Sequence, residues 1–331
     1  MRILVTGSSG HLGEALVRTL RKSGHQPIGI DIVPSPCTDH VSSLVDRAAV
    51  RACMAHVDAV LHTATLHKPH VDSHTRQEFV DTNITGTLNL LEEAAAAGVS
   101  MFIFTSTTSA FGRALTPVAG DPAVWITEDV RPIPKNIYGA TKVAAEDLCE
   151  LFQRDTGMPC LILRTSRFFP EQDDDARMRA SYSADNAKVN ELLYRRVDLE
   201  DVVTAHVLAL EKAPQIGFAR YIISATTPFV PADLRELGTN APAVVSRYFP
   251  NYEAAYRRRG WTMFPRLDRV YVNERARREL GWRPRYDFAF ALARLEANEE
   301  WRSPLALAIG AKGYHPNGAS WSRTKGATFV P

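Results

Sequence analysis

The glycine-rich loop "TGSSGHLG", which contains Gly7, Gly10 and Gly13, restricts the possible folds of this chain more than any other stretch. The β-rich run "RILV" precedes it, and residues 11–24 follow with the apolar spacing of a helix. In such a loop the first glycine permits a tight turn, the second lets the backbone approach a phosphate, and the third lets helix and strand pack closely. Free N–H groups and the positive end of the helix dipole would then face a diphosphate. The loop therefore predicts a dinucleotide site formed by Gly7, Gly10, His11, Leu12 and Gly13.

Short strands and helical stretches alternate after this loop, up to about residue 225. Apolar strand patterns recur in the stretches 26–31, 58–64, 101–107, 158–164 and 219–225. Helical spacing is found between several of them, in the stretches 83–98, 138–152 and 198–212. This alternation predicts an α/β fold, a Rossmann-type doubly wound parallel sheet with helices on both faces.

Two segments interrupt the alternation and predict a smaller second subdomain. The residues after Arg164 are polar, and from Pro228 the pattern becomes short helices with loops. We expect residues 1–165 plus about 195–225 to form the Rossmann domain that binds the cofactor. Residues of about 166–194 plus 226–315 would form a smaller, mostly C-terminal substrate-binding subdomain. The stretch 316–331 has little apolar periodicity and is expected to be an extended tail.

Asp31 closes the second expected strand, 18 residues after Gly13. A carboxylate at this place accepts hydrogen bonds from the ribose hydroxyls of NAD and repels the additional phosphate of NADP. No Arg or Lys follows closely, because the next residues are "IVPSP". The pattern favours NAD over NADP. The alternative is that Asp31 is a surface residue in a turn.

Charge and cysteine content argue against several other classes of protein. Lys plus Arg number 39 and Asp plus Glu 37, so the net charge of +2 gives no electrostatic reason to expect a nucleic-acid or membrane partner. The four cysteines have no CxxC spacing and are interpreted as reduced thiols. The N-terminus does not resemble a signal peptide, and no apolar run is long enough for a membrane span. We therefore expect a cytoplasmic protein.

Hydroxyl and phenol side chains form a second group of candidate site residues. The stretch 102–112, "FIFTSTTSAFG", places hydroxyls at the end of an expected strand, where ligands of doubly wound sheets bind. Tyr138 lies four residues before Lys142, so the two share one face of the expected helix. Turn chemistry would also explain the hydroxyls, and a surface Tyr beside a snorkelled Lys would explain the pair.

Together, the glycine loop, Asp31, the hydroxyl-rich strand end and the Tyr–Lys pair resemble the extended short-chain dehydrogenase/reductases, in particular the NAD-dependent epimerase/dehydratase family. The resemblance implies that Tyr138 is the general acid/base, that Thr107 orients the reacting oxygen and that Lys142 contacts the nicotinamide ribose. It also implies cofactor contacts for His62, Thr63, Ala64 and Asn83. A nearby ammonium group and the nicotinamide charge would lower the pKa of Tyr138 from about 10.

Several positions depart from the pattern of that family. Thr108 and Ser109 replace the Asp-Glu pair of dehydratases, which argues against dehydration, because elimination of water needs an additional acid and base. Arg167 stands where an Asn is usual, and it would pair either with an anionic group of the substrate or with the loop Asp173–Asp175. Arg195 lies one position from the register of an Arg that the family places near a nucleotide phosphate.

Four histidines lie in the stretch 62–74, "HTATLHKPHVDSH". His67 and His70 lie in an expected loop and do not form a helical i, i+4 pair, so we expect no metal site, and we expect His67 to line the substrate pocket instead. The complete expected substrate set is His67, Thr107, Thr108, Arg167 and Arg195.

The first hypothesis for function is a nucleotide-sugar epimerase or a close relative that uses NAD to act on a secondary alcohol of a sugar-like substrate. The alternative is a net NAD(P)-dependent dehydrogenase or ketoreductase of a free sugar, sugar acid or other polar alcohol. A second alternative is a non-catalytic protein that senses the cofactor. By the resemblance we also expect a homodimer, formed through the helices at about 84–98 and 138–155, with Leu88, Leu91, Leu148 and Leu151 beyond the core face.

Overall fold

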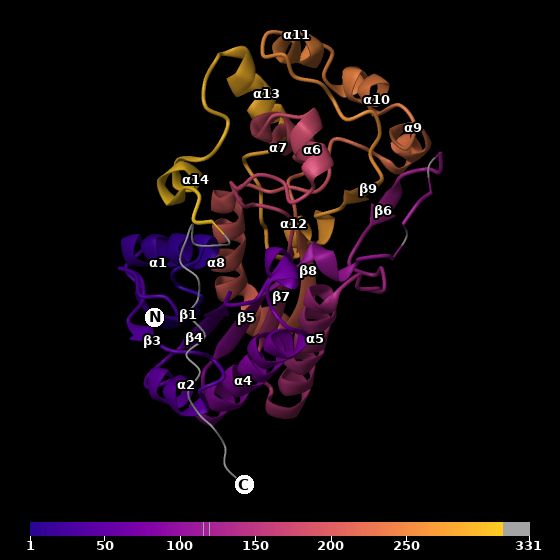
Figure 1. Ribbon diagram of the computed structural model, residues 1–331. Coiled ribbons are helices and arrows are strands. Elements are labelled where there is room, and N and C mark those ends of the chain that lie inside the picture. The colour runs from indigo at the N-terminus through magenta and orange to yellow at the C-terminus, as the bar shows by residue number, and fades with distance from the viewer. Residues whose placement is uncertain (115, 119, 314–331) are drawn as a thin grey trace.

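The computed structural model describes residues 1–114, 116–118 and 120–313. The expected tail at 316–331 lies outside the described residues. Seven strands form one sheet in the order β3-β2-β1-β4-β5-β7-β8, and every pairing in it is parallel. This confirms the predicted doubly wound α/β fold (Figure 1). The strands are β1 (Arg2–Thr6), β2 (Gln26–Asp31), β3 (His40–Val41), β4 (Ala59–His62), β5 (Met101–Thr107), β7 (Cys160–Thr165) and β8 (Phe218–Ile223).

Helices cover both faces of the sheet because the strand side chains are apolar on both sides. Alternate residues of β1 point to opposite faces: Ile3 and Val5 pack in one core cluster and Leu4 in another. The first cluster includes residues of α1 (His11–Lys22), α8 (Leu199–Ile216), α12 (Glu274–Glu279) and α14 (Pro304–Ile309). The second includes residues of α2 (Arg47–Cys53), α4 (Gly86–Ala96) and α5 (Ile137–Thr156).

A long helical segment before β5 contains a local change of winding. The helix α3 (Arg76–Val80) continues through a π-helical turn at Asp81–Thr85 into α4. Such turns often occur at functional sites. The segment places Asn83 inside the turn, between the loop after β4 and α5.

A separate core cluster lies beyond the carboxyl ends of the strands. Its helices gather at one end of the molecule in Figure 1. They are α6 (Ala176–Ser181), α7 (Ala184–Glu191), α9 (Leu234–Leu237), α10 (Ala241–Tyr248), α11 (Tyr252–Arg257) and α13 (Phe288–Glu296). This cluster supports the proposed substrate subdomain, whose boundaries remain a prediction.

A two-stranded parallel sheet links this end to the first half of the chain. It pairs β6 (Val124–Ile126) with β9 (Arg269–Tyr271), an arrangement that the sequence analysis did not anticipate. Within the described residues, no helix combines the length and apolar character needed to cross a bilayer.

Candidate active site

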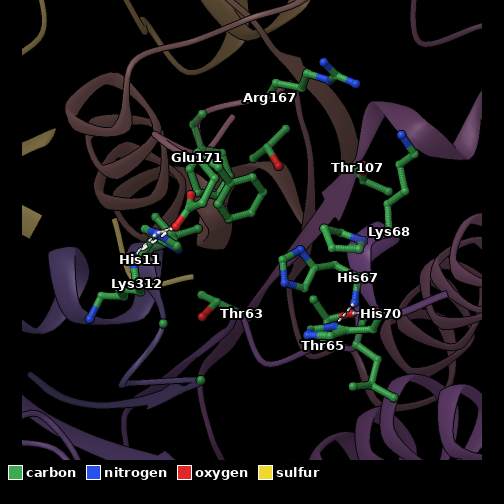
Figure 2. A pocket seen from close by; sticks show the side chains of 18 of the residues that line it. His11, Thr63, Thr65, His67, Lys68, His70, Thr107, Arg167, Glu171 and Lys312 are labelled. Carbon is green, nitrogen blue, oxygen red and sulfur yellow. Dashed lines mark hydrogen bonds and ion pairs between the residues drawn. The ribbon is translucent and has the colours of Figure 1, made fainter. Parts of the chain in front are cut away.

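A cavity of about 1050 Å³ opens at the carboxyl ends of β1, β4 and β5. One end is lined by the glycine loop and Asp31, and the other by Thr107, Tyr138 and the segment 165–169. Figure 2 shows side chains from both ends and from the C-terminal segment facing the same hollow. The sheet order reverses between β1 and β4, which is where doubly wound sheets bind their ligands.

The glycine loop has the geometry that a diphosphate needs. Gly7 has a φ of +67°, which favours glycine, and a Cβ on Gly13 would lie 1.9 Å from the carbonyl oxygen of Gly7. Gly10 is the N-cap of α1, and within the described residues no side chain caps that helix end. Its first N–H groups are therefore available to an anion, so these residues fit the phosphates of a dinucleotide.

Asp31 is fixed at the end of β2 on the cavity wall. Its carboxylate accepts a hydrogen bond from Ser9 N at 3.0 Å and another from Val33 N at 2.9 Å. The carboxylate thus lies beside the glycine loop, as a contact to the ribose hydroxyls of NAD requires. Ser43 and Leu44 line the same end of the cavity.

His62 lies below the cavity and does not line it, whereas Thr63 and Ala64 do. Its ring nitrogens are 2.7 Å from Thr6 Oγ1 and 2.9 Å from Thr87 Oγ1. Burial, together with Lys142, lowers its pKa well below the usual value, so the imidazole is neutral. The Thr6 hydroxyl also accepts hydrogen bonds from the amides of Thr63 and Ala64. His62 therefore positions the wall formed by its two neighbours.

Asn83 also acts from behind the wall. Its amide donates to Leu66 O at 2.9 Å and to Thr141 Oγ1 at 3.0 Å, and its oxygen accepts from Leu66 N at 2.8 Å. These bonds join the loop after β4 to α5. Asn83 thus fixes the spacing between the cofactor wall and the helix that carries Tyr138.

Tyr138 lies in the first turn of α5, which Asn136 caps by accepting a hydrogen bond from Gly139 N. The phenol lines the cavity next to Thr107. Burial raises the pKa of Tyr138 to about 12, and a hydrogen bond with the Thr107 side chain offsets part of the increase. In the protein alone, the phenol is therefore protonated at neutral pH.

Lys142 is buried behind Tyr138 and does not line the cavity. Its ammonium nitrogen lies 3.9 Å from the centre of the Phe104 ring. Burial lowers the pKa of Lys142 to about 7, against the opposing effect of Glu146. The expected lowering of the Tyr138 pKa is not found in the protein alone, because burial is the largest influence on both groups.

The arginines at the substrate end are engaged by carboxylates. Arg167 lines the cavity, pairs with Asp173 and lies 2.8 Å from Glu191, so of the two alternatives for Arg167 the structure has the loop ion pair. Arg195 pairs with Glu191 at 3.0 Å and is not among the residues that line the cavity. Arg196 does line it, and it also contacts Glu191. Glu191 was not among the residues expected from the sequence, and no local spacing identifies it.

His67 lines the cavity together with His70, and Thr108 lines it too. Burial lowers the pKa of His67 to about 3, with a further contribution from His70, so His67 is a neutral hydrogen-bonding group. Its ring lies 5.2 Å from that of Phe169. Among the residues that the structure describes, no group of three or more His, Cys, Asp or Glu side chains is arranged to hold a metal ion.

Comparison with known proteins agrees with this geometry. The sequence profile described as "NAD dependent epimerase/dehydratase family" matches residues 3–221. A UDP-glucose 4-epimerase of Rhizobium meliloti is 26% identical over 91% of this chain and 97% of its own. A 3-beta-hydroxysteroid dehydrogenase of Mycolicibacterium neoaurum is 29% identical over 63% of this chain, which spans about half (54%) of that relative.

A solved structure resembles this fold along most of the chain. It is a short-chain dehydrogenase/reductase superfamily protein from Agrobacterium tumefaciens with bound NAD. The two share 26% identity with a TM-score of 0.64, over 90% of this chain and 96% of the other.

Proposed function

The chain belongs to the NAD dependent epimerase/dehydratase family and uses NAD, and from that premise we propose that it moves a hydride between NAD and a secondary alcohol of a sugar-like substrate. The observation that carries this proposal is that Thr107 and Tyr138 line the same cavity as the glycine loop and Asp31. One cavity can thus receive the cofactor and the reacting alcohol together. Such an enzyme is an NAD-dependent epimerase or oxidoreductase, and the alternative of a non-catalytic sensor is set aside.

In the proposed mechanism, Thr107 and Tyr138 hold the reacting oxygen between their hydroxyl groups. Bound NAD would supply a hydride acceptor and, once reduced, a hydride donor. As the substrate hydroxyl is oxidised, Tyr138 takes its proton, and in the reverse direction Tyr138 returns a proton to the oxyanion. The protonated phenol suits the reverse direction directly. For oxidation, the ammonium of Lys142 and the nicotinamide charge would have to lower the pKa of Tyr138.

Replacement of Tyr138 by Phe tests this proton transfer. We expect Tyr138→Phe to reduce turnover by roughly 10²–10⁴-fold, because it removes the acid/base group. NAD binding, measured by calorimetry, should stay within a few-fold of the wild type because the ring and its packing remain. Full activity in Tyr138→Phe would contradict the proposed mechanism.

Within this class, the first choice is a nucleotide-sugar epimerase or a close relative. The similarity to a UDP-glucose 4-epimerase along nearly the whole length of both chains supports it. The second choice is a net dehydrogenase or ketoreductase. The internal pairing of Arg167 and the hydroxysteroid dehydrogenase among the relatives favour this second choice.

The two choices differ in the fate of the reduced cofactor. Purified enzyme would be supplied with candidate nucleotide sugars and free sugars in excess NAD. NADH would be followed by absorbance and products by NMR. A stereoisomer formed without added cofactor supports the epimerase. NADH formed in proportion to product supports the dehydrogenase.

A further inference from the structure

The described chain ends in a segment that returns to the cofactor end of the cavity. Helix α14 is anchored on the core by Ile309, and residues 310–313 then cross towards the glycine loop. Lys312 and Gly313 line the cavity together with Gly10, about 300 residues earlier in the sequence. Figure 2 shows Lys312 beside His11 and Glu171.

Polar contacts hold this segment in place from two sides. The ammonium of Lys312 donates to Ser9 O in the glycine loop at 2.7 Å and pairs with Glu14 in the first turn of α1. The backbone amides of Lys312 and Gly313 donate to Glu171 Oε1 at 2.9 and 3.0 Å. The same carboxylate oxygen lies 2.8 Å from His11 Nε2. Three segments far apart in sequence therefore meet at one carboxylate.

Glu171 is the centre of this junction and remains ionised. Its hydrogen bonds from His11 and the amide of Lys312 hold its pKa at about 2, although burial acts in the opposite direction. Its second oxygen, Oε2, is buried with no hydrogen-bond partner in the described residues. A carboxylate with one unsatisfied oxygen is poorly suited to permanent closure, because an unmade buried hydrogen bond has a cost in free energy.

We propose that residues 310–313 form a latch over the phosphate end of the cofactor groove. In the closed state, Lys312 contacts the glycine loop, and Glu171 accepts hydrogen bonds from the backbone amides of Lys312 and Gly313. NAD then enters and leaves only when these contacts break. In the closed state the ammonium group of Lys312 also contacts the backbone oxygen of Ser9, which lies in the loop whose amides would face the diphosphate. The latch requires only that the protein binds NAD, so it holds for an epimerase and for a dehydrogenase alike.

The contacts are of a strength that permits opening. The segment is held by a few hydrogen bonds and one ion pair near the surface, and breaking them replaces each with contacts to water. Apolar anchoring stops at Ile309 within the described residues, since residues 310–313 contribute no side chain to the core clusters. The segment can therefore open without unfolding α14.

The test measures the rates of NADH binding and release by stopped-flow fluorescence, with Lys312→Ala as the main variant. We expect release to be roughly tenfold faster, because one charge-assisted contact is lost. Association should also be faster, since the groove is open for a larger fraction of time. Arg18→Ala is the matched control: it removes the other cation that pairs with Glu14 and leaves residues 310–313 untouched.

Each outcome has a distinct meaning. Faster release with unchanged association would make Lys312 an ordinary cofactor contact and overturn the latch. Unchanged release, or an equal effect of Arg18→Ala, would also overturn it.

Hydrogen exchange of the unmodified protein supplies a second measurement if Lys312→Ala fails to fold. We expect the amides of Lys312 and Gly313 to exchange more slowly with saturating NAD than without it. Equal exchange in both states would overturn the proposal. Neither experiment uses substrate, so a failure of the latch is distinguishable from a failure of the proposed reaction.

Discussion

At the scale of single residues, burial moves Tyr138 and Lys142 towards their neutral forms. The pKa of Tyr138 rises to about 12 and that of Lys142 falls to about 7, and desolvation is the largest cause of both shifts. The phenol is therefore not ionised in advance, and the amine carries its charge only part of the time. A bound nicotinamide would act on a phenol that is protonated and an amine that is half protonated near neutral pH.

The depressed pKa of Lys142 predicts a particular pH dependence of stability. Between about pH 7 and 10, the unfolded chain binds a proton at this lysine that the folded chain does not. The free energy of unfolding should therefore rise with pH in this range, by up to about 1.4 kcal/mol per pH unit. In Lys142→Met this contribution is absent. The free energy of unfolding of the wild type minus that of the variant should therefore increase as the pH rises.

Urea unfolding of both proteins at several pH values between about 7.5 and 9.5 measures this difference. Lys212→Met, which replaces an exposed lysine on α8, should follow the wild type at every pH. Parallel curves for the wild type and Lys142→Met would contradict the prediction.

Sequence alone identified residues whose role depends on local spacing. Gly7, Gly13 and Asp31 belong to one β1–α1–β2 unit, and Tyr138 follows from its distance to Lys142 along one helix. Lys312 and Glu171 could not be identified in this way. They approach the glycine loop only through long-range packing, and a lone Lys or Glu in a loop carries no spacing signal.

At the scale of elements, the packing of α1 against the glycine loop that follows β1 depends on the absence of a side chain at Gly13. A Cβ there would come within 1.9 Å of Gly7 O, and the neighbouring backbone leaves no room for it. We expect Gly13→Ala to push α1 away from β1, to lower the free energy of unfolding by roughly 1–3 kcal/mol and to weaken NAD binding. Chemical denaturation and calorimetry measure the two effects.

Gly98→Ala is the control for backbone strain. Gly98 has a φ of +70° and nothing within 4 Å of its added Cβ, so it tests conformation without a clash. It should cost about 1–2 kcal/mol and leave NAD binding unchanged. An equal loss of NAD affinity in both variants would refute the account given for Gly13.

The strands and helices of the main sheet could be predicted because their apolar periods are clear. The sheet of β6 and β9 could not, because each strand has only three residues and the two lie far apart in the sequence. The segment after Arg164, which from the sequence was only a polar interruption of the alternation, contains α6 and α7. Their side chains pack on the separate core cluster, which a one-dimensional pattern does not reveal.

At the scale of the whole molecule, we propose a homodimer formed by α4 and α5. Leu88 and Leu148 are half-buried, and Leu151 is 40% exposed. Leu91, also expected on this face, was wrongly placed there, since it is fully buried in the core between α4 and the sheet. Light scattering should give about twice the chain mass of 36.7 kDa.

Leu151→Glu should convert this dimer to the monomer, because it places a charge in the proposed apolar contact. Val230→Glu, at a comparably exposed position (48%), should leave the mass unchanged. A wild-type protein that scatters as a monomer would exclude the dimer.

The pairing of β6 with β9 has a consequence for the order in which the chain assembles during translation. Residues 124–126 leave the ribosome well before their partners at 269–271. At synthesis rates of about 5–20 residues per second, β6 waits for roughly 7–30 s without its hydrogen-bonding neighbour. Within the described residues, the five N-terminal strands of the main sheet pair only with one another and with β7, so most of that sheet can form in this interval. The substrate end is completed last, when the emerging C-terminal half supplies the missing strand.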